Sequence, residues 1–227
     1  MSTINSKNVQ VGTSGTATDN FTLYQPATPD GTVRLGVGNS GATTLDAMTV
    51  TSAGAVTFSG AVQVSGVATN VYPIVSGTAV TSPSGTSINF TSVPSWVKRI
   101  TLIANDISFA AAGTSRIRIG TSGGLVSTGY SSANGTISNA NTTVVSTITD
   151  GFPGPITGSA AATATIVCTI FNVTGNTWTA ITQAVRPTDL LTQNGVGFIA
   201  LAGTLDRISI VATTSTFDAG TINILYE

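Results

Sequence analysis

Aspartates are the residues with the greatest capacity for chemistry in this sequence, because its 227 residues include no histidine. Without histidine the chain lacks the commonest general base, the Ser–His and Cys–His nucleophile systems and most zinc and copper sites. A pair of carboxylates could still cleave a glycosidic bond. Each aspartate considered lies beside a turn or a strand end, however, where Asp is favoured for turn hydrogen bonds alone. We therefore expect no enzymatic activity from the candidates Asp106, Asp150, Asp189, Asp206 and Asp218.

No segment has the pattern of a cofactor or metal site. The glycine-rich "GTSGGL" lacks the lysine and the following helix that would hold a phosphate. No close-spaced D-x-D-x-D-G run is present to bind calcium. The single cysteine, Cys168, lies in the apolar run "TATIVCTIF", which favours a small buried side chain over a reactive thiol. We expect no cofactor and no bound metal.

Two arginines and one tyrosine are the candidate ligand contacts. In "SRIRIG", Arg116 and Arg118 share the strand face opposite the isoleucines, and their guanidiniums could bind an anionic glycan. A solvated strand face or a salt bridge between subunits is the favoured alternative. Tyr130 is the lone aromatic residue of a long low-complexity segment, residues 121–141. Loops of this length in compact β domains are often binding or assembly surfaces.

The composition indicates an all-β chain with an uncharged surface. Only 7% of the residues are charged, whereas about a quarter is typical of a soluble domain. Lysine occurs only at Lys7 and Lys98 and glutamate only at Glu227, while valine, isoleucine and threonine abound, so we expect almost no helix. The net charge of -1, without a basic stripe, argues against nucleic-acid binding. No apolar run reaches the roughly 18 residues needed for membrane insertion.

Residues 1–70 form the first of two expected domains. Short alternating segments are separated by turn signals such as "TPDGT", and large side chains are too few to stabilise this segment alone. In "AGAVTFSGAVQVSG", the alternation places Val56, Phe58, Val62 and Val64 on one face of an extended strand. No large residue nearby could cover that face, so its cover must come from elsewhere.

Residues 71–227 form the second expected domain, an antiparallel, jelly-roll-like β-sandwich. Its strands are longer, tight turns join several of them, and no helical segment intervenes. The segments 121–141 and 149–162 are expected to be loops. The expected strands cover residues 86–90, 97–107, 115–120, 143–149, 162–173, 177–185, 195–203, 206–213 and 221–227.

Three stretches of the chain resemble one known family. "VQVGTSGTATDNFTLYQPATPDGTVRLGVGNSGATTLDAMTVTSAGAVTFSG" resembles the attachment and shaft segments of bacteriophage tail-fibre-like virion proteins. "SGTAVTSPSGTSINFTSVPSWVKRITLI" and the terminal "LDRISIVATTSTFDAGTINILYE" resemble the C-terminal β domain of the same proteins. The elements "PSWVKRIT" and "TFDAGTINILYE" are the more specific parts, because low-complexity shaft segments converge easily.

The resemblance implies a fibrous homotrimer with an N-terminal extended β shaft. Three copies of "AVTFSGAVQV" would then turn Val56, Phe58, Val62 and Val64 towards a common axis. A second copy of the chain would thereby supply the cover that this face lacks. Intertwined copies would also hide strand edges, which invite aggregation at so low a charge density.

The resemblance also implies a function. We expect a virion protein, made in a host cytoplasm without a signal peptide, whose N-terminal segment docks to other virion proteins. Its C-terminal sandwich would contact a host surface glycan. The main alternative is a structural capsid-decoration, head-fibre or tail-assembly protein with no receptor role. A depolymerase ranks third, because the chain lacks histidine and a paired-aspartate pattern.

Overall fold

The chain is almost entirely β, which confirms the expected fold class. The computed structural model describes residues 8–59, 62–64, 67–69, 74–81, 83–140 and 143–227. Among these residues the only helical turns are two short 3-10 helices, η1 (Ala17–Asp19) and η2 (Pro187–Asp189). The chain divides into two compact units, Met1–Tyr72 and Pro73–Glu227, which are described separately. The attachment and shaft roles expected for residues 1–70 stay predictions.

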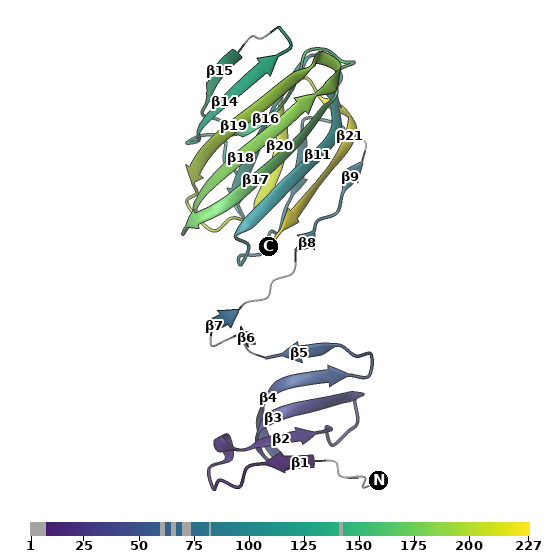
Figure 1. Ribbon diagram of the computed structural model, residues 1–227, viewed down its shortest axis with the longest axis vertical. Helices are drawn as coiled ribbons and strands as arrows, with labels where there is room; N and C mark the ends of the chain where they lie inside the picture. The colour runs from purple at the N-terminus through teal and green to yellow at the C-terminus, as the bar shows by residue number, and fades with distance from the viewer. Residues whose placement is uncertain (1–7, 60–61, 65–66, 70–73, 82, 141–142) are drawn as a thin grey trace. The chain divides into compact units, whose positions relative to one another are not determined.

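The N-terminal unit contains a five-stranded antiparallel meander in which each strand pairs with the next along the chain (Figure 1). The turn signal "TPDGT" forms the expected turn: Gly31 has a φ of +77°, and the Asp30 carboxylate accepts the backbone N–H of Thr32 at 3.0 Å. A separate two-stranded ladder joins β6 (Val62–Val64) to β7 (Val67–Thr69). The meander strands are β1 (Asn8–Val11), β2 (Phe21–Tyr24), β3 (Thr32–Asn39), β4 (Ala42–Thr51) and β5 (Val56–Phe58).

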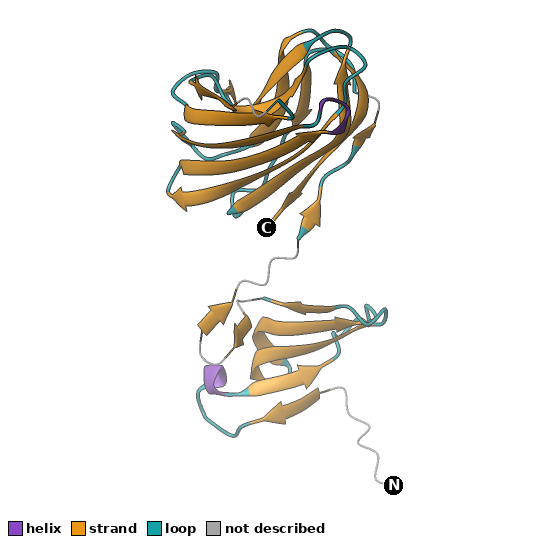
Figure 2. Cartoon of the chain, turned by 45° about the horizontal axis from the view of Figure 1, so that its top comes forward, coloured by secondary structure: helices purple, strands orange, loops and turns teal. Residues whose placement is uncertain are grey.

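The C-terminal unit is built from two antiparallel sheets that lie in layers (Figure 2). The large sheet has the order β15-β14-β19-β18-β17-β11-β21-β8, and β9 also pairs with β21. It contains β8 (Val75–Ser76), β9 (Val80–Thr81), β11 (Arg99–Phe109), β14 (Ser131–Ser138), β15 (Thr143–Ile148), β17 (Ala164–Thr174), β18 (Thr177–Arg186), β19 (Leu191–Ala200) and β21 (Phe217–Tyr226).

The small sheet has the order β10-β20-β12-β13, and β16 pairs with the same edge of β12 as β13 does, over Gly113–Ile117. Because every pairing in this unit is antiparallel, the architecture is that of a sandwich-like all-β domain. Its strands are β10 (Ser87–Phe90), β12 (Gly113–Thr121), β13 (Gly124–Leu125), β16 (Phe152–Thr157) and β20 (Arg207–Thr214).

The core of the C-terminal unit lies between its two sheets. Alternate residues of the long strands point inward, as the period of two requires, and Cys168 is fully buried among them, as the sequence predicts. Phe109 of β11 stacks on Phe217 of β21 with ring centroids 4.9 Å apart. Among the fully buried aliphatic residues are Ile100 and Leu102 of β11, Ile117 and Ile119 of β12, Ile166 and Ile170 of β17, and Ile208 and Ile210 of β20.

Two segments expected to be loops contain strands. β14, "SSANGTIS", lies within residues 121–141, and its poor β propensity is overridden by its pairing with both β15 and β19. β16, "FPGPIT", pairs only with β12, so its prolines occupy an edge where their missing N–H groups are tolerated. β16 packs closely on the large sheet, because a Cβ added at Gly195 would lie 2.5 Å from the Pro153 Cγ.

Candidate interaction surfaces

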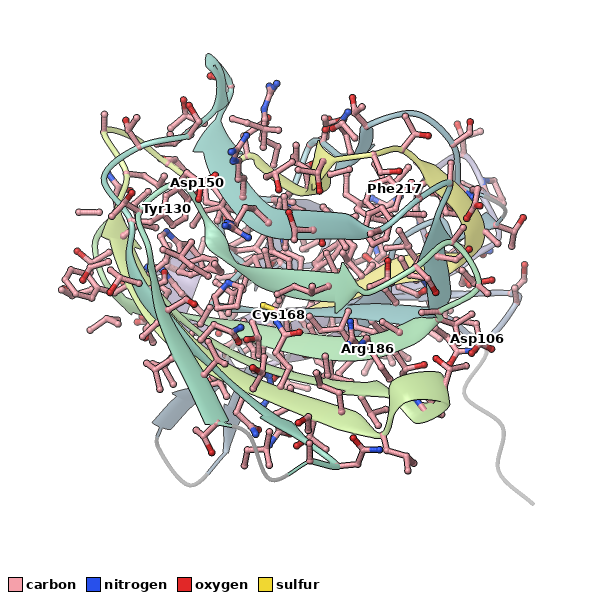
Figure 3. The ribbon with its side chains drawn as sticks, turned by 90° about the horizontal axis from the view of Figure 1, so that it is seen from above. Asp106, Tyr130, Asp150, Cys168, Arg186 and Phe217 are labelled. Atoms are coloured by element: carbon pink, nitrogen blue, oxygen red, sulfur yellow. The ribbon has the colours of Figure 1, made fainter. Side chains whose placement is uncertain are left out.

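Four of the five aspartates expected to serve turns have a hydrogen-bond or ion-pair partner. In Figure 3, Asp106 lies on the opposite side of the C-terminal unit from Asp150. No three His, Cys, Asp or Glu side chains gather into a metal-binding group within the described part of the chain. The side chain of Asp189 lies outside that part. Asp106 accepts a hydrogen bond from Asn105, Asp150 pairs with two arginines, Asp206 pairs with Arg207, and Asp218 accepts a hydrogen bond from the Ser108 hydroxyl.

Arg116 and Arg118 form one cluster with Asp150 on the outer side of the small sheet. The Nε of Arg116 donates to the Asp150 Oδ1 at 2.8 Å, and the Nη2 of Arg118 donates to the Oδ2 at 2.9 Å. Arg118 also donates from Nε to the Asp150 backbone oxygen at 2.6 Å. The salt bridge that the sequence suggested between subunits therefore forms within one chain. A glycan carboxylate would have to compete with Asp150 for both guanidiniums.

Asp150 couples the stability of this cluster to pH. Burial alone would raise the pKa of Asp150, but hydrogen bonds and positive charge from Arg116 and Arg118 outweigh burial and hold the pKa below its ordinary value. A depressed pKa gives stability that is present above the unfolded-state pKa of about 4 and is lost as pH falls through the folded-state value.

We expect Asp150→Asn to lower stability at pH 7 by on the order of 1 kcal/mol, after allowance for solvent screening of this partly exposed group. The melting temperature would fall by roughly 2–4 °C. Thermal unfolding of both proteins from pH 7 to pH 2.5 measures the effect. The difference in melting temperature between the two proteins should shrink below about pH 4. A difference that stays constant across the whole pH range would contradict the role assigned to Asp150.

Tyr130 is a core residue and not an exposed ligand contact, which corrects the expectation from sequence. Only 3% of its surface is exposed. Its hydroxyl accepts a hydrogen bond from the Ile119 N–H at 2.9 Å. The pairing of β12 with β16 ends at Ile117, so the tyrosine hydroxyl serves a backbone N–H that β16 does not reach. Its ring meets Phe152 edge-on with centroids 5.1 Å apart. Burial raises the pKa of Tyr130 to about 12, so the hydroxyl stays protonated at neutral pH.

One face of the N-terminal meander is apolar on all five strands. Residues paired across antiparallel strands point to the same side of a sheet, and one row of pairs crosses the entire meander. We call this surface the meander face. The row consists of Val9, Leu23, Leu35, Met48 and Phe58.

Two shorter rows extend the meander face. The first passes from Val11 through Phe21 and Val37 to Leu45. The second passes from Val33 through Val50 to Val56. Together the three rows place an apolar residue from every strand on the same side of the sheet.

No second layer within the described part of this unit covers the meander face. Exposed contiguous apolar patches of this kind mark interaction sites. Large apolar residues of the face remain 38–66% exposed: Val9, Val11, Phe21, Leu23, Val33, Leu45, Val56 and Phe58.

The opposite face of the meander is polar and internally bonded. Arg34 pairs with both Asp30 and Asp46, and the Tyr24 hydroxyl hydrogen-bonds to Asp46. The polar face is therefore suited to water, whereas the meander face is suited to another protein surface.

The structure places two of the four residues expected in a trimer core. Val56 and Phe58 lie on β5, each 52% exposed, on the same side of the sheet. Val62 and Val64 lie on β6, but their side chains are outside the described part of the chain. Sequence reasoning missed the members of the three rows that lie on β1 to β4. Alternation in "NVQV", "FTLY" and "TVRLGV" was the available signal on β1 to β3.

The described part of the chain holds no helical segment that could span a lipid bilayer. Comparison with protein-family models, with curated proteins and with solved structures finds no match for this chain.

Proposed function

We propose that this chain is a non-enzymatic bacteriophage virion protein, a short homotrimeric fibre or spike that assembles through its meander face. The observation that carries the proposal is the row of five apolar residues, from Val9 to Phe58, that no layer of the described unit covers. The resemblance of residues 9–60 to fibre attachment and shaft segments supports it independently. Three copies would bury their meander faces against one another.

In this proposal the N-terminal unit also attaches the protein to other virion proteins, and the C-terminal unit contacts a host surface glycan. The rigid antiparallel sheets of the C-terminal unit suit a display role, since binding surfaces are commonly carried on such scaffolds. The resemblance of the segment "PSWVKRIT" and of the closing "TFDAGTINILYE" to fibre C-terminal domains supports this role.

A structural protein with no receptor role is the second candidate. The observation that favours it concerns the three expected glycan contacts. Arg116 and Arg118 are engaged by Asp150, and Tyr130 is buried, so each has an internal task. A capsid-decoration, head-fibre or tail-assembly protein needs a stable fold and a docking face but no ligand site.

Location and adsorption separate these candidates. Antibody labelling of intact particles should place the protein at the tail, and the soluble purified chain should reduce phage adsorption to host cells. Labelling on the capsid without competition would support the structural candidate. Absence of the protein from purified particles would refute both. Release of reducing sugar from host polysaccharide by the chain would contradict the non-enzymatic assignment.

A further inference from the structure

The outward side of the large sheet in the C-terminal unit is a second uncovered apolar surface. β14, β19, β18 and β17 lie side by side (Figure 1), and their inward residues fill the core. Their outward residues include large apolar side chains that are 41–57% exposed. We call this surface the large-sheet face. These side chains are Ile137 of β14, Val196 and Phe198 of β19, Ile181 and Val185 of β18, and Val167 of β17.

These side chains are neighbours in the sheet. Ile181 pairs directly with Val196, and Phe198 lies two residues further along β19, opposite Thr179. Val167 of β17 pairs with Gln183 of β18. Val185 lies two residues beyond Gln183 on β18, on the same side of the sheet. An antiparallel sheet that faces water normally alternates apolar inward with polar outward residues. The large-sheet face departs from that rule over adjoining strands.

The large-sheet face carries no charge on its four strands. The outward positions of β14, β17, β18 and β19 hold serine, threonine, alanine, glycine, asparagine, glutamine and apolar residues. The outer side of the small sheet is different, because it holds the cluster of Arg116, Arg118 and Asp150. The C-terminal unit therefore separates a charged outer surface from an uncharged one.

We propose that the large-sheet face packs against the C-terminal units of other copies of this chain. An uncharged apolar surface fits an equally uncharged one, since a charged partner group buried there would stay unpaired at high cost. A second copy brings such a surface. Exposed contiguous apolar patches of this kind mark interaction surfaces.

The chain connection favours a second copy as the occupant, and this step rests on the proposed function. β7 ends at Thr69 and β8 begins at Val75, so only residues 70–74 lie between them. Five residues span at most about 18 Å. Once the N-terminal units assemble, the C-terminal units of the same assembly are therefore held at an effective concentration of about millimolar. A weak contact between large-sheet faces then forms within the assembly.

Thiol accessibility in the full-length chain tests this inference. Cys168 is fully buried, so an introduced surface cysteine is the reactive thiol. We compare Val196→Cys, on the large-sheet face, with the matched control Asn89→Cys, at an exposed position on the outer side of the small sheet. We expect Val196→Cys to react with a maleimide about tenfold more slowly than the control, because the interface covers it. Ile181→Cys provides a second probe of the same face.

The native mass of each variant, measured by light scattering, makes the outcomes distinguishable. Slow labelling at both Val196→Cys and Ile181→Cys in an oligomer supports the interface. Equally fast labelling at these positions and at Asn89→Cys in an oligomer overturns it, while leaving the meander-face assembly of the proposed function standing. A monomer that labels fast everywhere overturns both. If the cysteines on the large-sheet face label slowly but the protein is absent from purified virions, this interface is supported and the proposed function is refuted.

Discussion

The double variant Leu23→Asp/Phe58→Asp is expected to be a monomer of about 22.7 kDa, whereas the parent protein is expected to form a trimer of about three times that mass, near 68 kDa. Both residues belong to the row that crosses the meander face, at 44% and 52% exposure. In the monomer their carboxylates stay in water. In an assembly they would be buried without a partner, at a cost of several kcal/mol for each ion. Light scattering at equal concentrations measures the mass.

Thr57→Asp is the matched control for this variant. Thr57 lies between Val56 and Phe58 on β5, so it is exposed on the opposite side of the sheet. A carboxylate at this position on the same strand should leave the proposed trimer intact. A circular dichroism spectrum of β type in all proteins excludes unfolding as the cause. A double variant that remains a soluble trimer would refute assembly through the meander face.

Phe217→Ala is expected to destabilise the C-terminal unit by about 3–5 kcal/mol, the range for removing a buried aromatic side chain. Phe217 is 2% exposed and stacks on Phe109, with which it also pairs between β21 and β11. Its truncation leaves a cavity in the core beside Phe109, next to the β8 edge of the large sheet. Urea-induced unfolding followed by tryptophan fluorescence reports on this unit, which contains both Trp96 and Trp178.

Leu190→Ala is the control for the core variant, because Leu190 is 66% exposed beside η2. Its truncation should change the free energy of unfolding by no more than about 0.5 kcal/mol. If the two variants unfolded at the same urea concentration with equal slopes, the aromatic stack would contribute nothing and the assigned core would be wrong.

The long strands of the C-terminal unit could be predicted because their alternation is strong and their residues are β-branched. β11, β17 and β18 begin and end within a few residues of the expected strands. β14 and β16 could not be predicted, because "SSANGTIS" and "FPGPIT" have poor local propensity and are fixed by pairing with β19 and β12. Tyr130 was misjudged for the same reason, since its burial depends on Phe152 and Ile119.

The candidate interface could be predicted only in part. Val56 and Phe58 were found because their alternation is local and the segment has nothing large beside it. Phe58 lies in one row with Leu23 and Leu35 only because of the register between neighbouring strands. A shift of that register by one residue would turn these side chains to the other face of the sheet. Sequence alternation reveals which residues share a strand face, but not which strands stand side by side.

The position of β21 in the large sheet has a consequence for folding. β21 lies between β11 and β8, and its residue Leu225 pairs with both Thr101 and Ser76, which are far away in the chain. Contacts between such distant segments require costly loop closure before they stabilise anything, so we expect slow folding. Until β21 is in place, β11 presents an unpaired edge to other chains. Newly made copies are therefore most open to mispairing with one another before this strand arrives.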